Sequence, residues 1–446
     1  MKRSAVEQSF ADGAHTTEKN PSYYTKVHRR KSLIHAWQII RESGIKSKSD
    51  ETRKEISAFN ENADNKIEQI YRKLRKKNYR FKPSKGITIP KKNKQDRPIV
   101  KSRIEDKIVQ RSILDVLQGD SNIREYISVA TSFGGIEQRS VKDAVKIAYE
   151  AMQNGAKWYI ASDIHDFFRK IPKEKALKII SQFMPDNEFN DLLEVAVRVE
   201  LENLAQLGEK RDLFPTDEIG VAQGCCLSPL IGNILLHDFD IKMNKRSISC
   251  LRYIDDFIIL GPTQRHVKAA FESAQEMLQE LGFDVYDPFK DTEKATFGPT
   301  DKGFDFLGCE IFPGLIRPTK KKRTAFLDKV EEILQESSRL MSDPAKTYTK
   351  RKSVIETLTD VSNVVMGWGS QYSFCNDIDI LKGLDRQINE MLVNYLLKYK
   401  KARDICRDDP LSARRLLGVH LLVDCKSNPI IQKTNVVSHN NQSKAL

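Results

Sequence analysis

The order of apolar and polar positions along the 446-residue chain predicts where its helices and strands lie. Apolar residues recur at helical spacing from about Ser32 to Leu74. Two apolar runs joined by a basic tip predict a β-hairpin at residues 85–102. Residues 156–168 predict a buried strand that ends in acids, and residues 248–261 predict a strand, a tight turn and a second strand. From Arg323 to Ala402 the spacing is helical, with few strand signals.

The remaining segments add helices and short strands to this pattern. Amphipathic or apolar helices are predicted at 105–118, at 173–207, in the second half of 219–243 and at 263–283, and short strands at 291–298 and 304–312. Strands and helices therefore alternate irregularly in the middle of the chain, and helices alone follow. This order predicts an α+β core with an all-α region after it.

Charge adds a candidate partner to this fold. The net charge is +13, and from Lys66 to Arg111 there are 17 Lys and Arg against 4 Asp and Glu. A second cluster, Arg317 to Arg323, has five basic residues and no acid. Concentrated positive charge of this kind is typical of proteins that bind a polyanion such as nucleic acid. A basic face that is simply solvated is the alternative for either cluster alone.

Cysteine content and hydropathy favour a soluble cytoplasmic protein. The seven cysteines form no CxxC pair and no zinc-like spacing with histidine, which predicts reduced thiols. No apolar run approaches the roughly 20 residues of a membrane-spanning helix. The first 20 residues have no apolar stretch typical of a secretory signal. We therefore expect no membrane partner.

Three aspartates at the ends of predicted buried strands are the candidate chemistry. Asp255 and Asp256 interrupt the apolar run "CLRYIDDFIILG", and Asp163 ends the run "WYIASD". If these strands are neighbours and a turn lies at the pair, the three carboxylates converge. Clustered oxygen ligands suit Mg²⁺, and two such ions can clamp both oxygens of a phosphoryl displacement. Taken alone, the pair is better explained as turn residues of an ordinary hairpin.

Several sequence blocks in order resemble one enzyme family. The blocks "SDIHDFF", "AQGCCLSPL" and "YIDD" are similar to those of reverse transcriptases of the bacterial lineage related to group II introns and retrons. The chain resembles most closely the defence-associated, abortive-infection-type enzymes of that lineage. The resemblance runs from about Ser84 to Trp368. It implies a right-hand polymerase with fingers, a ferredoxin-like palm and an all-α thumb.

The resemblance implies domain bounds and catalytic residues. The expected parts are an N-terminal tail at 1–30, fingers and palm at 31–315, a helical thumb or maturase-like region at 316–425 and a C-terminal tail at 426–446. Asp163, Asp255 and Asp256 are then the catalytic carboxylates. With the carbonyl of Ile164 they are expected to bind two Mg²⁺ ions, with Mn²⁺ as the alternative ion.

The same resemblance implies nucleotide and nucleic-acid contacts. The residues expected at the nucleotide are Lys91 and Arg97 on the triphosphate, Phe168 against a ribose 2′-OH, Gln223 and Gly224 in the pocket, and Lys294 as a proton donor to pyrophosphate. The residues expected at the nucleic acid are Arg139, Tyr253, Leu307 and Gly308. Without the resemblance, Phe168 would be a core aromatic and Lys294 a surface lysine. Trp368 is expected to pack in the thumb core.

Departures from the family leave the template open. Cys225 and Cys226 stand where intron enzymes have small residues, "SFGG" replaces the usual block before Arg139, and His165 is unusual. The expected partners are an RNA template, foremost a dedicated noncoding RNA, a DNA or RNA primer and dNTPs, with oligomerisation left open.

The expected function is RNA-directed DNA synthesis in anti-phage defence. A group II intron-type enzyme, a retron-type enzyme making a branched product, and template-independent or protein-primed synthesis are the enzymatic alternatives. An RNA-binding maturase-like factor that performs no chemistry is the non-enzymatic one.

Overall fold

The computed structural model describes residues 21–424 except 48, 92–93, 216–217 and 246, and for 91 and 94–95 it describes the backbone only. The chain divides into two compact units, Met1–Leu307 and Gly308–Leu446. This division falls before the expected palm–thumb boundary at residue 315. The expected C-terminal tail and most of the N-terminal one lie outside the described residues.

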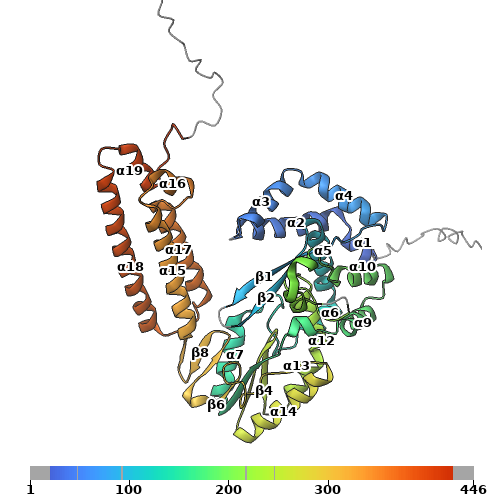
Figure 1. The fold of residues 1–446 in the computed structure, drawn as a ribbon. Helices are drawn as coiled ribbons and strands as arrows, with labels where there is room; N and C mark the ends of the chain where they lie inside the picture. The colour runs from blue at the N-terminus through green and yellow to red at the C-terminus, as the bar shows by residue number, and fades with distance from the viewer. Residues whose placement is uncertain (1–20, 48, 92–93, 216–217, 246, 425–446) are drawn as a thin grey trace, which may run out of the picture. The chain divides into compact units, whose positions relative to one another are not determined.

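The first unit begins with helices that the predicted N-terminal tail had not included. Tyr24 and Val27 lie on the first of them and are buried against later helices, so residues 21–30 belong to the folded unit. A single helical turn is too short to show an apolar repeat, which is why the pattern missed it. The helices of this region are α1 (Tyr23–Val27), α2 (Arg30–Ile45), α3 (Asp50–Asn60), α4 (Ala63–Arg75), α5 (Ile104–Gly119) and α6 (Ser121–Ile127) (Figure 1).

The predicted basic hairpin is confirmed. Strands β1 (Lys85–Lys91) and β2 (Lys94–Lys101) pair in antiparallel register, with Ile89 opposite Arg97. A segment between α10 and the palm binds the base of the hairpin, where Asn203 accepts from the Gly86 N–H and donates to the Gly86 carbonyl at 2.8 and 2.9 Å. The elements of this part of the chain are α8 (Phe167–Lys170), α9 (Lys173–Phe183), α10 (Asn187–Val197), α11 (Leu204–Leu207) and a 3₁₀ turn (Gly208–Leu213).

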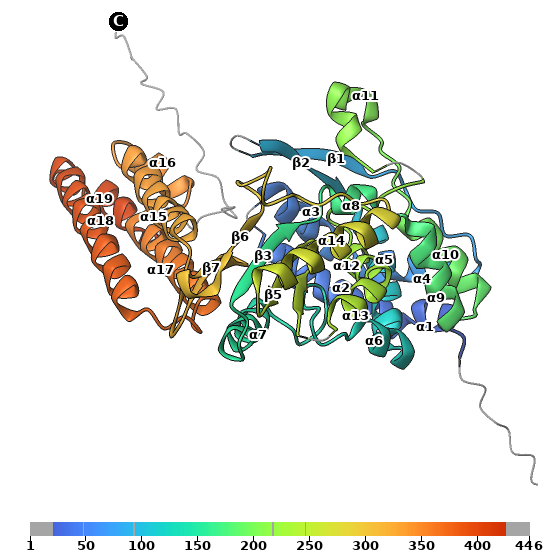
Figure 2. The ribbon, with the colours of Figure 1, turned by 90° about the horizontal axis from the view of Figure 1, so that it is seen from below.

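A four-stranded antiparallel sheet forms the palm, with strand order β4-β5-β3-β6. Strands β3, β5 and β6 are labelled in Figure 2. Helices α13 and α14 pack on each other, and α14 and α7 contact the central strands. Because Ile258 and Ile259 are adjacent on β5 and both fully buried, both faces of the sheet are covered. The elements are α7 (Val141–Gln153), β3 (Trp158–Asp163), α12 (Ser228–Leu235), α13 (His237–Met243), β4 (Ser249–Tyr253), β5 (Asp256–Gly261), α14 (Gln264–Glu280), β6 (Thr296–Pro299) and β7 (Phe304–Phe306).

This topology confirms the expected ferredoxin-like palm. In chain order the elements run strand, helix, strand, strand, helix, strand, and the first strand lies between the third and the fourth. One detail differs from the expected long apolar helix before the YIDD hairpin. The helix is broken at Leu236 into α12 and α13.

The second unit is a β-hairpin followed by helices, whereas the expected thumb was all-α and began at residue 316. Its core includes Phe326 and Val330 of α15 with Leu384 and Ile388 of α18. Trp368 stacks on Phe326 with ring centroids 4.4 Å apart, which confirms its expected packing role. The elements are β8 (Cys309–Phe312), β9 (Leu315–Pro318), α15 (Lys320–Leu340), α16 (Pro344–Thr349), α17 (Val354–Gln371), α18 (Ile378–Ile405) and α19 (Pro410–Leu417).

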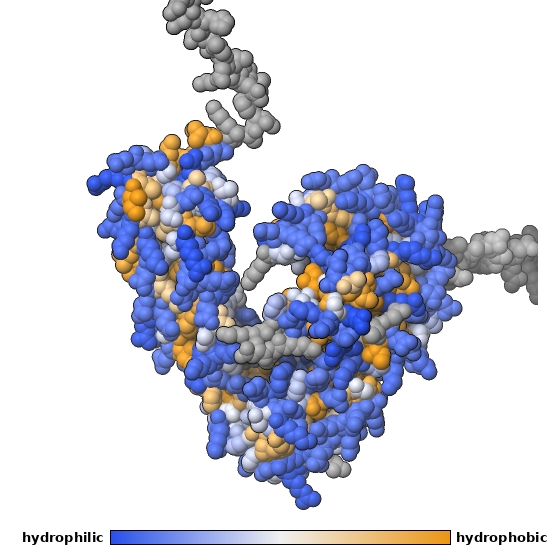
Figure 3. Space-filling view, viewed as in Figure 1, coloured by the Kyte–Doolittle hydropathy of each residue, from blue (hydrophilic) through white to orange (hydrophobic). Residues whose placement is uncertain are grey.

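The surface carries mainly polar residues, and hydrophobic residues appear on the visible face as separate patches (Figure 3). Within the described parts of the chain, no helix combines the length and the apolar character needed to cross a bilayer. The cysteines that the structure describes are all free thiols: Cys225, Cys226, Cys250, Cys309, Cys375 and Cys406.

Candidate active site

Strand register brings two of the predicted aspartates face to face. Strands β3 and β5 are antiparallel neighbours, and Asp163 at the end of β3 pairs with Asp256 at the start of β5. Residues opposite each other on adjacent strands point to the same side of the sheet, so both carboxylates share one face. Asp255 lies in the turn just before, and its carbonyl accepts from the Ile164 N–H at 3.0 Å.

The turn that presents the pair has an unusual backbone. Ile254 has a φ of 63°, a left-handed conformation that is disfavoured for a β-branched residue. Tyr253 and Asp256 close the hairpin on either side of it. This tight turn places the adjacent residues Asp255 and Asp256 at one cavity, although successive strand residues normally point to opposite faces.

Close approach of the carboxylates perturbs their chemistry. Burial, the hydrogen bond to Asp163 and the charges of Asp163 and Asp255 together raise the pKa of Asp256 to about 9, against a smaller opposing effect of Lys294. Two carboxylates this close cannot both ionise cheaply without a cation beside them. The site therefore favours either a bound proton or a bound metal ion.

One cavity of about 670 Å³ gathers most of the predicted site residues. Its lining also includes Asp96, His165, Arg169 and Tyr286, which were not among the predicted site residues. The predicted residues that line it are Arg97, Asp163, Ile164, Phe168, Gln223, Tyr253, Asp255, Asp256 and Lys294.

The fingers hairpin contributes a cation to this cavity. Arg97 on β2 is exposed, and its Nε donates to the side-chain oxygen of Gln223 at 3.1 Å. The Gln223 carbonyl accepts from the Val100 N–H at 2.9 Å, which ties the loop to the same strand. The Arg97 guanidinium also carries two Nη groups, which can donate to an anion at the cavity that Arg97 lines.

Two further residues line the cavity beside the aspartates. Phe168 is partly buried, its ring centroid lies 5.4 Å from that of Phe167, and its carbonyl accepts from the Val221 N–H. The Lys294 ammonium lies over the Tyr286 ring, 4.6 Å from the centroid. The Tyr286 N–H in turn donates to the Asp163 carbonyl at 3.3 Å. Tyr286 therefore connects Lys294 to the strand that carries Asp163, a link that spacing in the sequence does not reveal.

Gly224 and Arg139 have structural roles outside the cavity lining. Gly224 has a φ of 112°, and a Cβ there would lie 3.1 Å from the Val100 carbonyl, so the close approach is to the hairpin backbone. The Arg139 guanidinium donates to the carbonyls of Ser128, Val129 and Ser132. These bonds stabilise the preceding loop. A direct template contact by Arg139 stays a prediction.

Of the last predicted residues, Leu307 ends the first unit, Gly308 begins the second, and Lys91 has no described side chain. Leu307 and Gly308 both have positive φ, 50° and 82°, as a tight turn requires, and neither lines the cavity. The side chain of Lys91 lies outside the described residues. Their nucleic-acid and nucleotide contacts remain predictions.

The aspartates fit a hard divalent cation by ligand type. All their donor atoms are oxygen, which suits Mg²⁺. As they stand, no three His, Cys, Asp or Glu side chains in the described part of the chain form a ready metal-binding group. The residues that could hold the cation are therefore the close pair Asp163 and Asp256. Asp255 and the buried Ile164 line the same cavity.

Comparison with known proteins identifies a family whose matched region contains this site. The family "Reverse transcriptase (RNA-dependent DNA polymerase)" matches residues 89–311, half of the chain, and includes all three aspartates. Group II intron-encoded protein LtrA of Lactococcus lactis is 28% identical over 180 residues, which are 40% of this chain and 28% of LtrA. Protein YkfC of Escherichia coli is 25% identical over 302 residues, 58% of this chain and 73% of YkfC.

Other relatives match over shorter shares of their length. An uncharacterised 91 kDa protein in a cob intron of Schizosaccharomyces pombe is 30% identical over 174 residues, 39% of this chain and 20% of that protein. The chain thus spans only a fifth of this relative and about a quarter of LtrA. Among solved structures, Candida albicans telomerase matches with a TM-score of 0.40 and 13% identity, covering 74% of this chain and 64% of telomerase.

The family match and the palm topology agree on the fold. The match begins within β1 of the fingers hairpin and covers the palm sheet and the YIDD turn, and the sheet order is the one expected for the palm of a right-hand polymerase. The expected fold class is confirmed. The chain belongs to the reverse transcriptase family.

Proposed function

We propose that the protein is an RNA-directed DNA polymerase that adds deoxynucleotides to a primer 3′-OH. The observation that carries this proposal is the single cavity that gathers the Asp163–Asp256 pair, Asp255, Arg97 and Phe168. Nucleotidyl transfer to a chosen sugar requires a cation site for the reaction, an arginine that binds the triphosphate and an aromatic ring that contacts the sugar. Family membership alone does not establish this activity, because the chain spans only part of the length of several relatives.

Each side chain has a role in this reaction. The three aspartates, with the Ile164 carbonyl, would hold Mg²⁺, and bound Mg²⁺ lowers the pKa of the primer hydroxyl and neutralises charge on the pyrophosphate. Arg97 binds the triphosphate through its fork. The primer hydroxyl gives its proton to water, its oxygen forms a bond to the α-phosphorus, and the bond from the α-phosphorus to the oxygen shared with the β-phosphate breaks, releasing pyrophosphate. Lys294 gives a proton to the leaving pyrophosphate.

Phe168 and the palm loops select the substrates. The Phe168 ring occupies the space that a ribose 2′-OH would need, so deoxynucleotides are preferred. Tyr253, Leu307 and Gly308 are proposed contacts of the primer or template, and Gly224 shapes the pocket through the hairpin backbone. Lys91 is proposed as a second triphosphate contact beside Arg97.

A polymerase assay tests the proposal. Purified protein with its co-purifying RNA should incorporate labelled dNTP in the presence of Mg²⁺, and Asp255→Ala should abolish incorporation. Asp284→Ala is the matched control, because Asp284 lies on the same unit, is exposed and pairs with Lys170 at 2.7 Å outside the cavity lining. Equal incorporation by wild type and Asp255→Ala would remove the proposed chemistry.

We further propose that the protein acts in anti-phage defence, that a dedicated noncoding RNA is its template and that it is located in the cytoplasm. It rests on the resemblance of the sequence blocks. Loss of plaque protection in an Asp255→Ala, Asp256→Ala strain is the expected result, and unchanged protection would contradict it.

An intron-associated enzyme is the second candidate. The names of LtrA and of the S. pombe relative, both tied to introns, favour it. Sequencing the RNA that co-purifies with the wild-type protein separates the two, because an intron RNA and a dedicated noncoding RNA differ in sequence and in genomic origin.

A further inference from the structure

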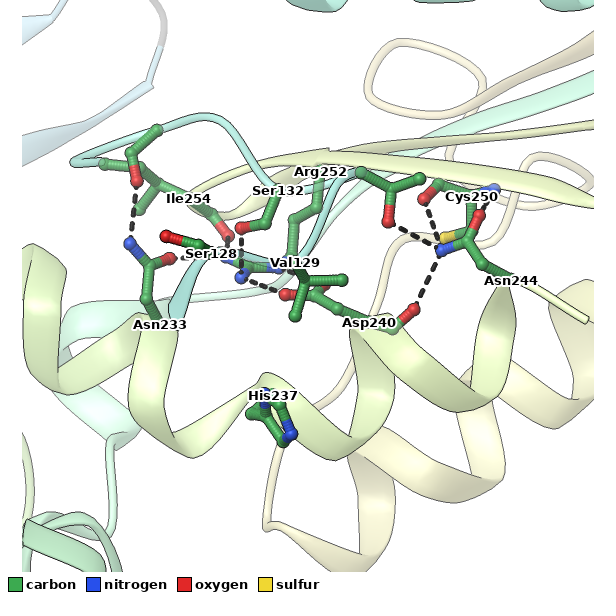
Figure 4. Close-up of polar contacts among 12 residues, drawn as sticks. Ser128, Val129, Ser132, Asn233, His237, Asp240, Asn244, Cys250, Arg252 and Ile254 are labelled. Atoms are coloured by element: carbon green, nitrogen blue, oxygen red, sulfur yellow. Dashed lines mark hydrogen bonds and ion pairs between the residues drawn. The ribbon is translucent and has the colours of Figure 1, made fainter. Parts of the chain in front are cut away.

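A charged side chain is completely buried next to the turn that carries Asp255 and Asp256. Arg252 on β4 has no exposed surface, and Asp240 on α13 is 2% exposed. The Arg252 Nε and Nη2 groups donate to the two Asp240 carboxylate oxygens at 2.7 and 2.6 Å (Figure 4). This two-bond geometry is the strong form of an arginine–carboxylate pair.

The rest of the guanidinium is bound as well, and one bond reaches the turn. Nη2 donates to the Ser132 hydroxyl at 2.8 Å, and Nη1 donates to the Asn233 side-chain oxygen at 3.1 Å. Nη1 also donates to the Ile254 carbonyl at 2.9 Å. Figure 4 shows Arg252 and Ile254 in this network. Ile254 immediately precedes Asp255, so this bond fixes the backbone that carries the aspartate pair.

The turn needs such support because of its conformation. Ile254 holds a φ of 63°, which a β-branched residue adopts only where the surroundings impose it. The loop residue Gly134 packs on it so closely that a Cβ at 134 would lie 2.4 Å from Ile254 Cγ1. Asn233 donates to the Gly134 carbonyl at 2.9 Å, so the same network holds the packing surface.

The backbone of β4 joins this network too. The Arg252 N–H donates to the Thr131 carbonyl, and the Phe133 N–H donates to the Arg252 carbonyl, both at 2.9 Å. The loop before α7, helices α12 and α13 and strand β4 therefore converge on one guanidinium. Arg252, Asp240 and the residues of α12 and of the loop that bond to Arg252 do not line the cavity. Ile254 does line it, so the network reaches the cavity through the turn.

Stability alone does not explain this arrangement. Replacing a buried ion pair by packed apolar residues is often neutral or stabilising, because desolvation offsets the attraction. A fully bonded arginine instead specifies one backbone arrangement. The feature that distinguishes this pair from an ordinary core ion pair is the bond to the carbonyl of the left-handed residue.

We propose that Arg252, held by Asp240, is a positioning residue that sets the geometry of Asp255 and Asp256 through the Ile254 carbonyl. This inference rests on the proposed function for its catalytic readout, and on cation binding by the aspartates for its second readout. A displacement of reacting groups by about 1 Å costs on the order of 100-fold in rate. Loss of the bond should therefore lower kcat and cation affinity together, while binding of template and primer is unchanged.

Arg252→Lys tests the bond while it keeps a positive charge beside Asp240. A single ammonium cannot reach both Asp240 oxygens and the Ile254 carbonyl at once. The expected results are a fall in kcat of about 100-fold, a weaker affinity for Mn²⁺ measured by electron paramagnetic resonance, and a dNTP KM and template–primer Kd within about twofold of wild type.

Asn244→Ala is the matched structural control. Asn244 bonds the Thr131 hydroxyl, the Asp240 carbonyl and the Cys250 backbone at 2.8 to 2.9 Å, and none of these bonds reaches residues 252–256 (Figure 4). Its removal should lower the melting temperature while kcat per folded molecule and Mn²⁺ affinity stay at the wild-type values. If Asn244→Ala loses kcat and Mn²⁺ affinity as Arg252→Lys does, the role of Arg252 is merely structural and the inference is overturned.

A second variant keeps the test decisive if Arg252→Lys does not fold. The double variant Arg252→Met, Asp240→Leu removes both buried charges and keeps an apolar core, so it should fold. It also lacks the bond to Ile254, so kcat and Mn²⁺ affinity should fall although its melting temperature is close to wild type. A stable double variant with full kcat and full Mn²⁺ affinity would overturn the inference.

The two readouts separate this inference from the proposed function. If the wild-type protein incorporates no dNTP but Arg252→Lys selectively loses Mn²⁺ affinity, the proposed function fails and the positioning role stands. If the wild-type protein polymerises and Arg252→Lys matches it in kcat and Mn²⁺ affinity, the proposed function stands and the positioning role fails.

Discussion

Asp163 and Asp256 face each other across two neighbouring antiparallel strands and share a hydrogen bond between their carboxyl groups. The contact is unfavourable for two ionised groups, and burial, this contact and the charge of Asp255 together raise the pKa of Asp256 to about 9. A polymerase that binds cations between these groups would keep this repulsion because the cation relieves it. The active site is then a place where stability is given up for function.

Asp256→Asn should therefore stabilise the protein while it removes activity. An amide at this position keeps a hydrogen bond to Asp163 and removes the repulsion. In EDTA at pH 8 we expect the melting temperature to rise by about 2 °C or more, measured by differential scanning fluorimetry, and dNTP incorporation to fall to background.

Asp284→Asn is the control for this stability effect. Its carboxylate is bonded to Lys170, which holds the pKa of Asp284 below its usual range, so its neutralisation removes a favourable contact. The melting temperature should stay the same or fall slightly. A rise equal to that of Asp256→Asn would mean that the effect reflects net charge and not the Asp163–Asp256 contact.

Cation binding should depend on pH with a defined sign. The raised pKa of Asp256 means that its proton is bound in the folded state below about pH 9 and must leave when a cation binds. Without a cation, the folded state binds more protons than the unfolded state, so the free energy of unfolding falls as pH rises from about 4 towards 9. Because one proton leaves for each cation bound, the Mg²⁺ concentration for half-maximal stabilisation should fall about tenfold for each unit that the pH rises, up to about pH 9.

Thermal shifts measured in Mg²⁺ titrations at several pH values between 6.5 and 9 test this dependence. Asp256→Asn has no proton to release, so its Mg²⁺ response should be weak and flat with pH. A wild-type midpoint that does not change across this range would show that Asp256 is already ionised without a cation.

Phe168→Ala should relax the choice of sugar. With the ring removed, a ribonucleotide no longer meets an aromatic beside Asp163, and the ratio of kcat/KM for dNTP over rNTP should fall by about tenfold or more. Phe168→Tyr keeps the ring and should keep the ratio. Single-nucleotide extension with each substrate measures it, and an unchanged ratio in Phe168→Ala would assign Phe168 to packing against Phe167 alone.

The sequence predicted site residues where a charged side chain interrupts a run of apolar residues. Asp163, Asp255 and Asp256 are acids at the ends of strand-forming runs, and burial of such groups requires a reason. The same signal was present for Arg252, a charge inside the run "CLRY", and it could have been used. Its partner Asp240 could not be identified, because the pairing depends on how α13 packs on β4.

Other features were hidden for similar physical reasons. Arg139 stands in a block that resembles a template-binding one, but whether a guanidinium binds its own loop or a nucleic acid depends on the loop conformation. The helix break at Leu236 has no Pro or Gly beside it to mark it. Tyr286 lies far in sequence from Asp163, and only the folded chain places it between that strand and Lys294.

Arg97→Ala should weaken nucleotide binding more than it slows chemistry. Arg97 reaches the cavity from β2 and is held by one bond to Gln223, which leaves the rest of its fork for the triphosphate. Hydrogen bonds to charged groups are each worth about 1.5–3 kcal/mol, so the KM for dNTP should rise by about 10- to 100-fold.

Arg97→Lys and Arg103→Ala sharpen this prediction. Lysine keeps the charge but not the two-bond geometry, so the KM should lie between those of wild type and Arg97→Ala. Arg103 lies at the start of α5, pairs with Glu202 at 3.1 Å and is outside the cavity lining, so its removal should leave the KM unchanged. Steady-state extension kinetics measures all three. If Arg103→Ala raises the KM as much as Arg97→Ala, the basic surface attracts nucleotide only through its overall charge, and a specific contact by Arg97 is ruled out.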